Sequence, residues 1–140
     1  MISLTKMLRE KQSGFTLIEL LIVVIIIAVL AAIAIPIYMN VRSRALVAAA
    51  QEELRNVGQA LEMYFVDHDT YNAGADWAAM TTTIEADGYM SNVPQNDPWA
   101  NPYTFTGAAT TYTLTSLGSD KAAGGTGYAA DIVYSDGAFQ

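Results

Sequence analysis

The chain of 140 residues has no cysteine, one histidine and only seven basic side chains. Without cysteine the chain can form no disulfide and offers no thiol nucleophile. A small domain without disulfides needs another source of stability, and a bound metal ion is one possibility. A single histidine also leaves no evident nucleophile–base pair of the kind that covalent catalysis requires. We therefore predict a protein that is not an enzyme.

The few charges are unevenly placed along the chain. Three of the seven basic side chains precede residue 12, a region with one acid, Glu10. Residues 15–140 carry the other four bases and 13 acids, which gives a net side-chain charge of −9. An acidic body argues against nucleic-acid binding by the single chain. The basic start fits the cytoplasmic side of a membrane by the positive-inside rule.

Hydrophobic residues are concentrated in one segment. Residues 20–35 are apolar without interruption, and the whole apolar segment, residues 15–37, contains 23 residues. A bilayer core needs roughly 20 helical residues, so this segment is predicted to span a membrane. No small-residue cleavage site of an ordinary secretory signal follows it. Pro36, near its end, is expected to kink or loosen the helix.

The helical pattern continues beyond the span. From Leu46 to Phe65 apolar residues recur every three or four positions, and polar side chains occupy the other faces. One helix is therefore predicted from Phe15 to about Val66, with a hydrophobic first half and an amphipathic second half. At 1.5 Å per residue it is roughly 75–80 Å long, so half of it must contact lipid or other subunits.

The remaining sequence predicts a small α+β domain. Residues 76–87 fit a short helix with Asp76 as its N-cap. Threonine-rich and aromatic runs with alternating polarity predict three strands, at residues 102–106, 110–117 and 131–135. The predicted fold is thus a long N-terminal helix packed on a small three-stranded antiparallel sheet.

The stretch SGFTLIELLIVVIIIAVLAAIAIPIY, residues 13–38, resembles the N-terminus of type IV pilins and pseudopilins. The resemblance rests on a short basic leader ending in Gly14, then Phe15, Glu19 and Pro36. It implies that a prepilin peptidase cuts between Gly14 and Phe15, that the new Phe15 amine is methylated, and that the apolar helix is kept.

The same resemblance divides the chain into three parts. It implies a leader peptide at residues 1–14, a transmembrane and filament-core helix at residues 15–37, and a pilin-like globular domain at residues 38–140. The leader is expected in the cytoplasm and the globular domain in the periplasm of a single-pass inner-membrane protein.

Glu19 is an acid within the apolar segment. An acid at the middle of a membrane helix costs about 2.5–3.5 kcal/mol, and less near the interface, so an acid retained there is predicted to have a function. We expect Glu19 to pair with the Phe15 amine of its own or a neighbouring subunit, which offsets the cost when subunits stack and sets their register. The alternative is an acid that extends to the lipid headgroups.

Two motifs in the C-terminal half resemble the major pseudopilin of type II secretion. The first is DPWANPY at residues 97–103, with Ala100 where that family usually has glycine, and the second is SLGSD at residues 116–120. A surface pilus subunit for adhesion, motility or DNA uptake stays an alternative, as does a membrane-anchored binding module that forms no filament.

In that family the loop after the second strand binds calcium, an ion that takes six to eight oxygen ligands. Carried over by position, the ligands are the carboxylates of Asp120 and Asp131 and the carbonyls of Leu117 and Ala122. Ala130 stands where some relatives have a further acid, which predicts a weaker site. The alternative is a flexible glycine-rich loop with solvated acids, and Asp136 is either a further ligand or a turn residue.

The resemblance implies a structural function, as the subunit of a helical filament assembled from the inner membrane. The implied partners are other copies of the chain, the prepilin peptidase, an inner-membrane assembly platform with its ATPase motor, and minor pilins or pseudopilins. In a type II secretion system the filament would drive folded proteins through the outer membrane.

Overall fold

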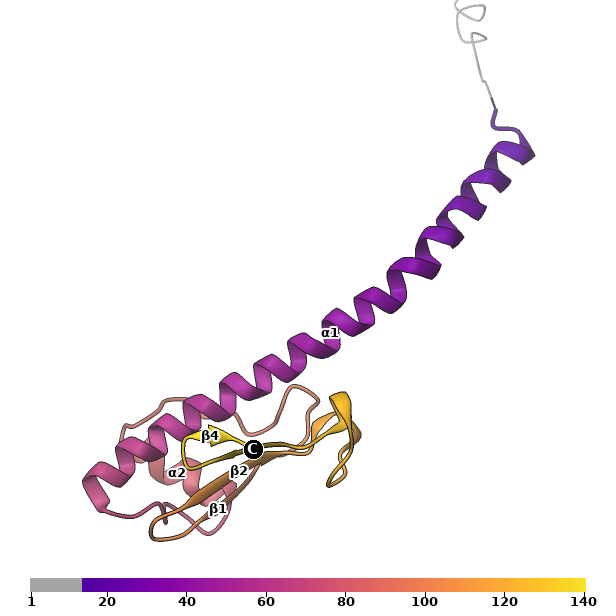
Figure 1. Cartoon of the computed structure of the whole chain (residues 1–140). Helices are drawn as coiled ribbons and strands as arrows, with labels where there is room; N and C mark the ends of the chain where they lie inside the picture. The colour runs from indigo at the N-terminus through magenta and orange to yellow at the C-terminus, as the bar shows by residue number, and fades with distance from the viewer. Residues whose placement is uncertain (1–13) are drawn as a thin grey trace, which may run out of the picture. The chain divides into compact units, whose positions relative to one another are not determined.

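The computed structural model describes residues 14–140, so most of the predicted leader lies outside the described residues. The chain divides into two compact units between Asn40 and Val41, and Figure 1 shows the course of the chain through both. Helix α1 (Leu17–His68) begins in the first unit and ends in the second. The helix predicted from the apolar run and the amphipathic pattern is confirmed, with each end two residues further along the chain.

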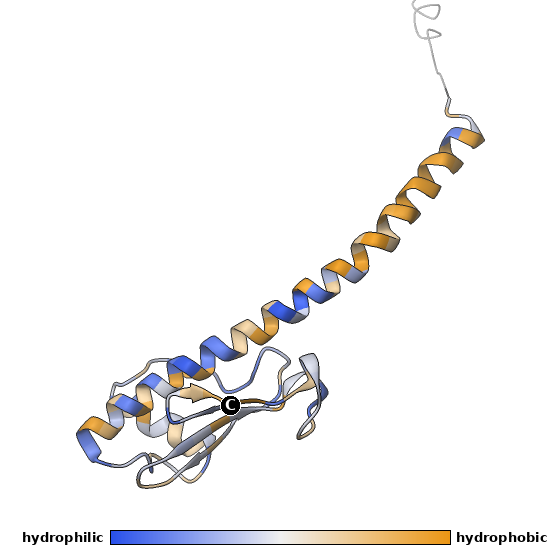
Figure 2. Ribbon diagram, viewed as in Figure 1, coloured by the Kyte–Doolittle hydropathy of each residue, from blue (hydrophilic) through white to orange (hydrophobic). Residues whose placement is uncertain are grey.

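In the first unit the described residues are almost entirely apolar helix. Its large side chains from Leu17 to Met39 are at least half exposed, and Figure 2 shows the hydrophobic colour along this part of α1. Within residues 14–140, α1 is the one helix long and apolar enough to cross a membrane. The helix continues through Pro36, and a kink there stays a prediction.

In the second unit α1 buries one stripe and is joined by a short helix, α2 (Trp77–Ala86). The buried α1 residues are Ala50, Leu54, Val57, Gly58, Ala60, Leu61 and Tyr64. The Asp76 side chain accepts a hydrogen bond from the Ala79 amide at 2.8 Å, which confirms Asp76 as the N-cap of α2.

The sheet has four antiparallel strands, one more than the sequence predicted. In the order in which they pair, the strands are β1 (Thr104–Gly107), β2 (Tyr112–Ser116), β3 (Ile132–Ser135) and β4 (Ala138–Phe139). The extra strand forms because Asp136 and Gly137 both have positive φ, 49° and 86°, as in a two-residue hairpin turn. This turn places Phe139 opposite Tyr134.

Tyrosine hydroxyls connect the acidic side chains of α1 to the rest of the second unit. Glu62 accepts hydrogen bonds from Tyr71 at 2.7 Å and from Tyr112 at 3.3 Å, and Glu53 accepts one from Tyr103. Burial, together with the Glu62 carboxylate, raises the pKa of Tyr71 to about 12, so its hydroxyl keeps its proton and donates at neutral pH. These bonds orient α1 on the core that β2 and β3 supply.

Gly58 marks the closest approach of α1 to the sheet. A Cβ atom there would clash with the Tyr134 ring and lie 3.0 Å from the Tyr112 hydroxyl. Gly58→Ala gains helix propensity of about 1 kcal/mol but is expected to lower the free energy of unfolding by roughly 1–2 kcal/mol net, because the rings cannot move freely in a packed core.

Denaturant unfolding of the detergent-solubilised chain measures this loss. The matched control is Gln59→Ala, at an exposed position on the next residue of the helix, which is expected to change stability by less than about 0.5 kcal/mol. A Gly58→Ala chain as stable as its parent would contradict the close-approach argument.

Candidate assembly and cation sites

The predicted cleavage bond lies in an open segment without regular secondary structure at the start of the described chain. Gly14, Phe15 and Thr16 precede the first residue of α1, and Phe15 is 89% exposed. A Cβ atom at Gly14 would meet no other atom within 4 Å. A protease therefore finds no local obstacle at this bond, although cleavage itself stays a prediction.

Glu19 closes a reciprocal cap on the N-terminus of α1. Its Oε2 accepts hydrogen bonds from the Thr16 amide at 2.8 Å and from the Thr16 hydroxyl at 2.9 Å. In return the Thr16 Oγ1 accepts a hydrogen bond from the Glu19 amide at 3.2 Å. This is a capping box, and its Thr-x-x-Glu signature was readable in the sequence although Thr16 was not predicted to matter.

The cap fixes where the charge of Glu19 sits. Both bonds use Oε2, and within residues 14–140 nothing donates to Oε1. A carboxylate can accept about four hydrogen bonds, and a helix N-terminus favours a negative charge. Glu19 is therefore preorganised with one oxygen satisfied within the subunit and the other able to accept a donor from outside.

The C-terminal loop between β2 and β3 is folded on itself. It contains two single-turn helices, η2 (Gly118–Asp120) and η3 (Gly127–Ala129). The Asp131 Oδ2 accepts from the Gly124 amide at 2.9 Å, and the Asp131 amide donates to the Gly124 carbonyl at 3.0 Å. Asp120 Oδ1 accepts from the Ala122 amide at 3.1 Å. These bonds hold both predicted carboxylate ligands in defined positions.

One oxygen of this loop has no partner. Asp131 Oδ1 is buried and accepts no hydrogen bond, which is costly for a charged group unless a donor or a cation satisfies it. Within residues 14–140 no three Asp, Glu, His or Cys side chains come together to hold a metal. A cation here would rely on two carboxylates and on carbonyls, an all-oxygen set that fits calcium rather than zinc.

A buried polar cluster holds the beginning of this loop. Asp97 is 4% exposed; its Oδ1 accepts from the Asn101 amide at 2.8 Å and its Oδ2 from the Ser116 hydroxyl at 2.6 Å. Asn101 Nδ2 donates to the Gly118 carbonyl at 2.7 Å. The two C-terminal motifs are therefore one structural unit, in which Ala100 adopts a φ of 64° that glycine takes more easily.

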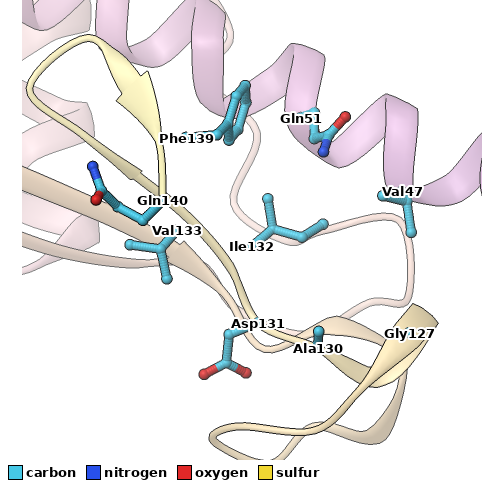
Figure 3. Close-up of a pocket in the computed structure, with 9 residues that line it drawn as sticks. All are labelled: Val47, Gln51, Gly127, Ala130, Asp131, Ile132, Val133, Phe139 and Gln140. Atoms are coloured by element: carbon cyan, nitrogen blue, oxygen red, sulfur yellow. The ribbon is translucent and has the colours of Figure 1, made fainter.

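Asp136 does not belong to this site. Its Oδ1 accepts from the Tyr112 amide at 2.9 Å in the β3–β4 turn, at the opposite end of β3 from Asp131. At the Asp131 end of β3, a groove of about 170 Å³ lies between α1 and the C-terminal segment. Asp131 is one of the residues that line this groove, and in Figure 3 its side chain is directed away from the α1 residues Val47 and Gln51.

These features define a class of protein. A long N-terminal helix with an apolar, exposed first half and a capped acid, whose second half packs on a small antiparallel sheet, is the architecture of a membrane-anchored, pilin-like subunit.

Comparison with known proteins identifies the family. The family described as "Type II secretion system (T2SS), protein G" matches residues 37–135, and the "Prokaryotic N-terminal methylation motif" matches residues 9–35. The chain belongs to the type II secretion system protein G family, whose members are pseudopilins.

The relatives support the same assignment. The "Type II secretion system core protein G" of Pseudomonas aeruginosa is 36% identical over 138 residues, which cover 90% of this chain and 96% of the relative. The protein of the same name from Vibrio cholerae is 32% identical over 134 residues, covering 88% and 91%. A "Fimbrial protein" of Neisseria meningitidis is 36% identical over 83 residues, but these cover 59% of this chain and 49% of the relative.

Proposed function

We propose that this chain is the major filament subunit of a type II secretion system. It enters the inner membrane with its leader in the cytoplasm and its globular domain in the periplasm. It is cut between Gly14 and Phe15, methylated on Phe15 and polymerised with its apolar helix half at the centre of the filament. The observation that carries the proposal is the exposed apolar first half of α1, which starts with a capped acid.

The apolar helix needs a second environment besides lipid if it is to leave the membrane. Its large side chains from Leu17 to Met39 are at least half exposed, so a single subunit buries little of this surface. Full burial of such a side chain is favourable by about 1.5–3 kcal/mol of free energy relative to exposure to water. Copies packed side by side supply that burial, which makes polymerisation the natural counterpart of extraction from the bilayer.

Glu19 supplies the register of this packing in the proposed mechanism. Its Oε1 is directed at no donor within the described part of its own chain, and the Phe15 amine created by cleavage is a cationic donor. Charge-assisted hydrogen bonds of this kind are about twice as strong as neutral ones. A subunit stacked with its Phe15 amine on a neighbour's Glu19 gains this bond, and a subunit shifted along the helix loses it.

The C-terminal loop is proposed to hold calcium. Asp120 and Asp131 would supply carboxylates, and Leu117 and Ala122 would supply backbone carbonyls. When bound, the ion would offset the charges of the two carboxylates and connect the two ends of the loop. The unsatisfied, buried Asp131 Oδ1 supports this assignment, as does the cluster around Asp97 that holds the Gly118 carbonyl at the start of the loop.

The secretion assignment also implies partners: a prepilin peptidase, an inner-membrane assembly platform with an ATPase motor, and minor pseudopilins. The surface-pilus alternative has less support, since the fimbrial relative covers 59% of this chain, whereas the secretion relatives of Pseudomonas aeruginosa and Vibrio cholerae cover 90% and 88% of it.

Mass spectrometry of the chain purified from membranes tests the processing step. We expect a mature protein that begins at Phe15 and carries one methyl group on its amine. Gly14→Ile, which adds a branched side chain at open backbone, is expected to leave the precursor uncut while the fold persists. A chain that keeps residue 1 in the presence of an active peptidase would support the anchored binding module instead.

A further inference from the structure

Two basic side chains follow the apolar part of α1 within a few residues. Residues 20–51 contain no acid, and their only charged side chains are Arg42 and Arg44. Figure 2 shows hydrophilic colour on α1 where the apolar part ends. In the proposed orientation both arginines lie on the periplasmic side of the membrane, where the positive-inside rule expects few bases. Their place in the sequence therefore runs against the usual distribution of bases around a span.

Neither arginine is neutralised by the described part of its own chain. Arg42 is exposed and, within residues 14–140, has no hydrogen bond or ion pair. Arg44 is also exposed, and its Nε donates a hydrogen bond to the Tyr128 hydroxyl at 3.4 Å. A guanidinium has five N–H donors, so most of the donors of Arg44 stay open to a partner from outside the chain. Both side chains thus keep their charge for such a partner.

The chain places both arginines at the level of the lipid headgroups. Arg42 follows Ile37, the end of the predicted span, by five residues, which is about 7.5 Å of helix, and Arg44 follows it by about 10.5 Å. The headgroup layer on each side of a bilayer is about 5–7.5 Å thick. Side chains of a helix tilt toward its N-terminus, which is here the membrane side, and long arginine side chains extend toward headgroups. These distances follow from chain connectivity and need no particular angle between the two units.

We propose that Arg42 and Arg44 bind the phosphate groups of anionic phospholipids in the outer leaflet of the inner membrane. A planar guanidinium donates two parallel hydrogen bonds to a phosphate, and its charge strengthens both. The two side chains are about 200° apart around the helix, so they bind different lipids on opposite sides of α1. The contact holds the inserted subunit at one depth before assembly. This inference rests on the membrane insertion in the proposed function and not on the filament.

The acids of a second copy are a less suitable partner than lipid phosphate. Two inserted copies side by side present α1 to each other at this level, and residues 20–51 of α1 hold no acid. The acids of the C-terminal loop, Asp120 and Asp131, already accept hydrogen bonds within that loop. Lipid phosphates, by contrast, surround the helix on every side from the moment of insertion.

Native mass spectrometry of the full chain released from lipid nanodiscs tests the contact. The nanodiscs contain phosphatidylcholine and phosphatidylglycerol in equal amounts, and the measurement counts the phosphatidylglycerol molecules that stay bound. Arg42→Gln/Arg44→Gln is expected to retain about twofold fewer than the parent, because bases next to a span attract anionic lipid. The matched control Arg55→Gln/Lys121→Gln removes the same charge elsewhere and is expected to retain as many as the parent. The leader bases are common to all three chains.

Two further measurements separate a lipid contact from a folding defect and from a free anion. Arg42→Gln alone breaks no contact within residues 14–140, so it is expected to keep the melting temperature of the parent while it still loses bound phosphatidylglycerol. Inorganic phosphate, compared with chloride at the same ionic strength, is expected to leave the lipid count unchanged. Displacement of phosphatidylglycerol by inorganic phosphate would overturn lipid as the partner.

The remaining outcomes distinguish the inference from the proposed function. Equal retention by the parent and Arg42→Gln/Arg44→Gln, or an equal loss in the matched control, would overturn the headgroup contact. Fewer filaments from Arg42→Gln/Arg44→Gln with unchanged lipid retention would assign the arginines to acids of a second copy instead. A parent chain that alkaline carbonate releases from membranes would overturn the membrane insertion itself, and with it the proposed function.

Discussion

Glu19→Gln is expected to leave insertion and cleavage intact and to reduce filament number by roughly ten- to a hundredfold. Glutamine has nearly the shape of glutamate and can still accept the hydrogen bonds of Thr16, so the start of α1 is preserved. What it loses is the negative charge that would receive the Phe15 amine of a neighbour. Hydrogen bonds to charged groups contribute about 1.5–3 kcal/mol, which is one to two factors of ten in each addition of a subunit.

Two measurements on the same cells give the result. Immunoblotting of sheared filaments with electron microscopy counts assembly, and mass spectrometry of the membrane fraction shows whether the Glu19→Gln chain begins at Phe15. We expect a processed chain that accumulates in the membrane. Filaments of parental number and length from the Glu19→Gln chain would remove the register function from this residue.

Thr16→Val serves as the matched control, because it removes the hydroxyl of the capping box and keeps the charge. Loss of an N-cap costs about 1 kcal/mol, and the Thr16 amide can still donate to Glu19. A milder assembly defect than that of Glu19→Gln is therefore expected. If both variants reduce filament number equally, the orientation that Thr16 imposes on the Glu19 carboxylate matters as much as the charge of that carboxylate.

The parts of the fold that follow from local patterns were predictable. The apolar run and the three-to-four-residue spacing after it predicted α1, and Asp76 before an apolar stretch predicted α2 with its cap. The fourth strand was missed because two residues are too few for a polarity pattern. The Asp136-Gly137 pair before Ala138 was nevertheless a hairpin signal, and it places β4 beside β3.

The site was predictable only where one short motif contained it. The leader end and Glu19 lie within six consecutive residues, so the resemblance could assign them. The cluster of Asp97, Asn101 and Ser116 joins two motifs separated by a hairpin, and no spacing rule indicates that their side chains meet. The unpartnered oxygen of Asp131 is likewise a property of packing, which depends on the whole loop.

Chelation is expected to lower the melting temperature of the chain, and added calcium to restore it. An extracytoplasmic calcium site with few carboxylates has a Kd of about 10⁻⁴–10⁻³ M. At ten times the Kd, bound ligand stabilises the fold by about 1.4 kcal/mol, which for a unit of this size corresponds to about 5–10 °C. A larger shift would indicate more ligands than Asp120, Asp131 and two carbonyls.

Asp131→Asn discriminates a calcium ligand from a buried structural acid. If Asp131 binds the ion, the Asp131→Asn variant loses the calcium-dependent shift in melting temperature. In chelator its melting temperature is expected to equal or exceed that of the parent chain, because the parent then buries a charged oxygen without a donor. Asp136→Asn, whose carboxylate serves the β3–β4 turn, is expected to keep the full shift. Equal melting temperatures of the parent chain with chelator and with calcium would contradict the site, and the loop would then be stabilised by its own hydrogen bonds alone.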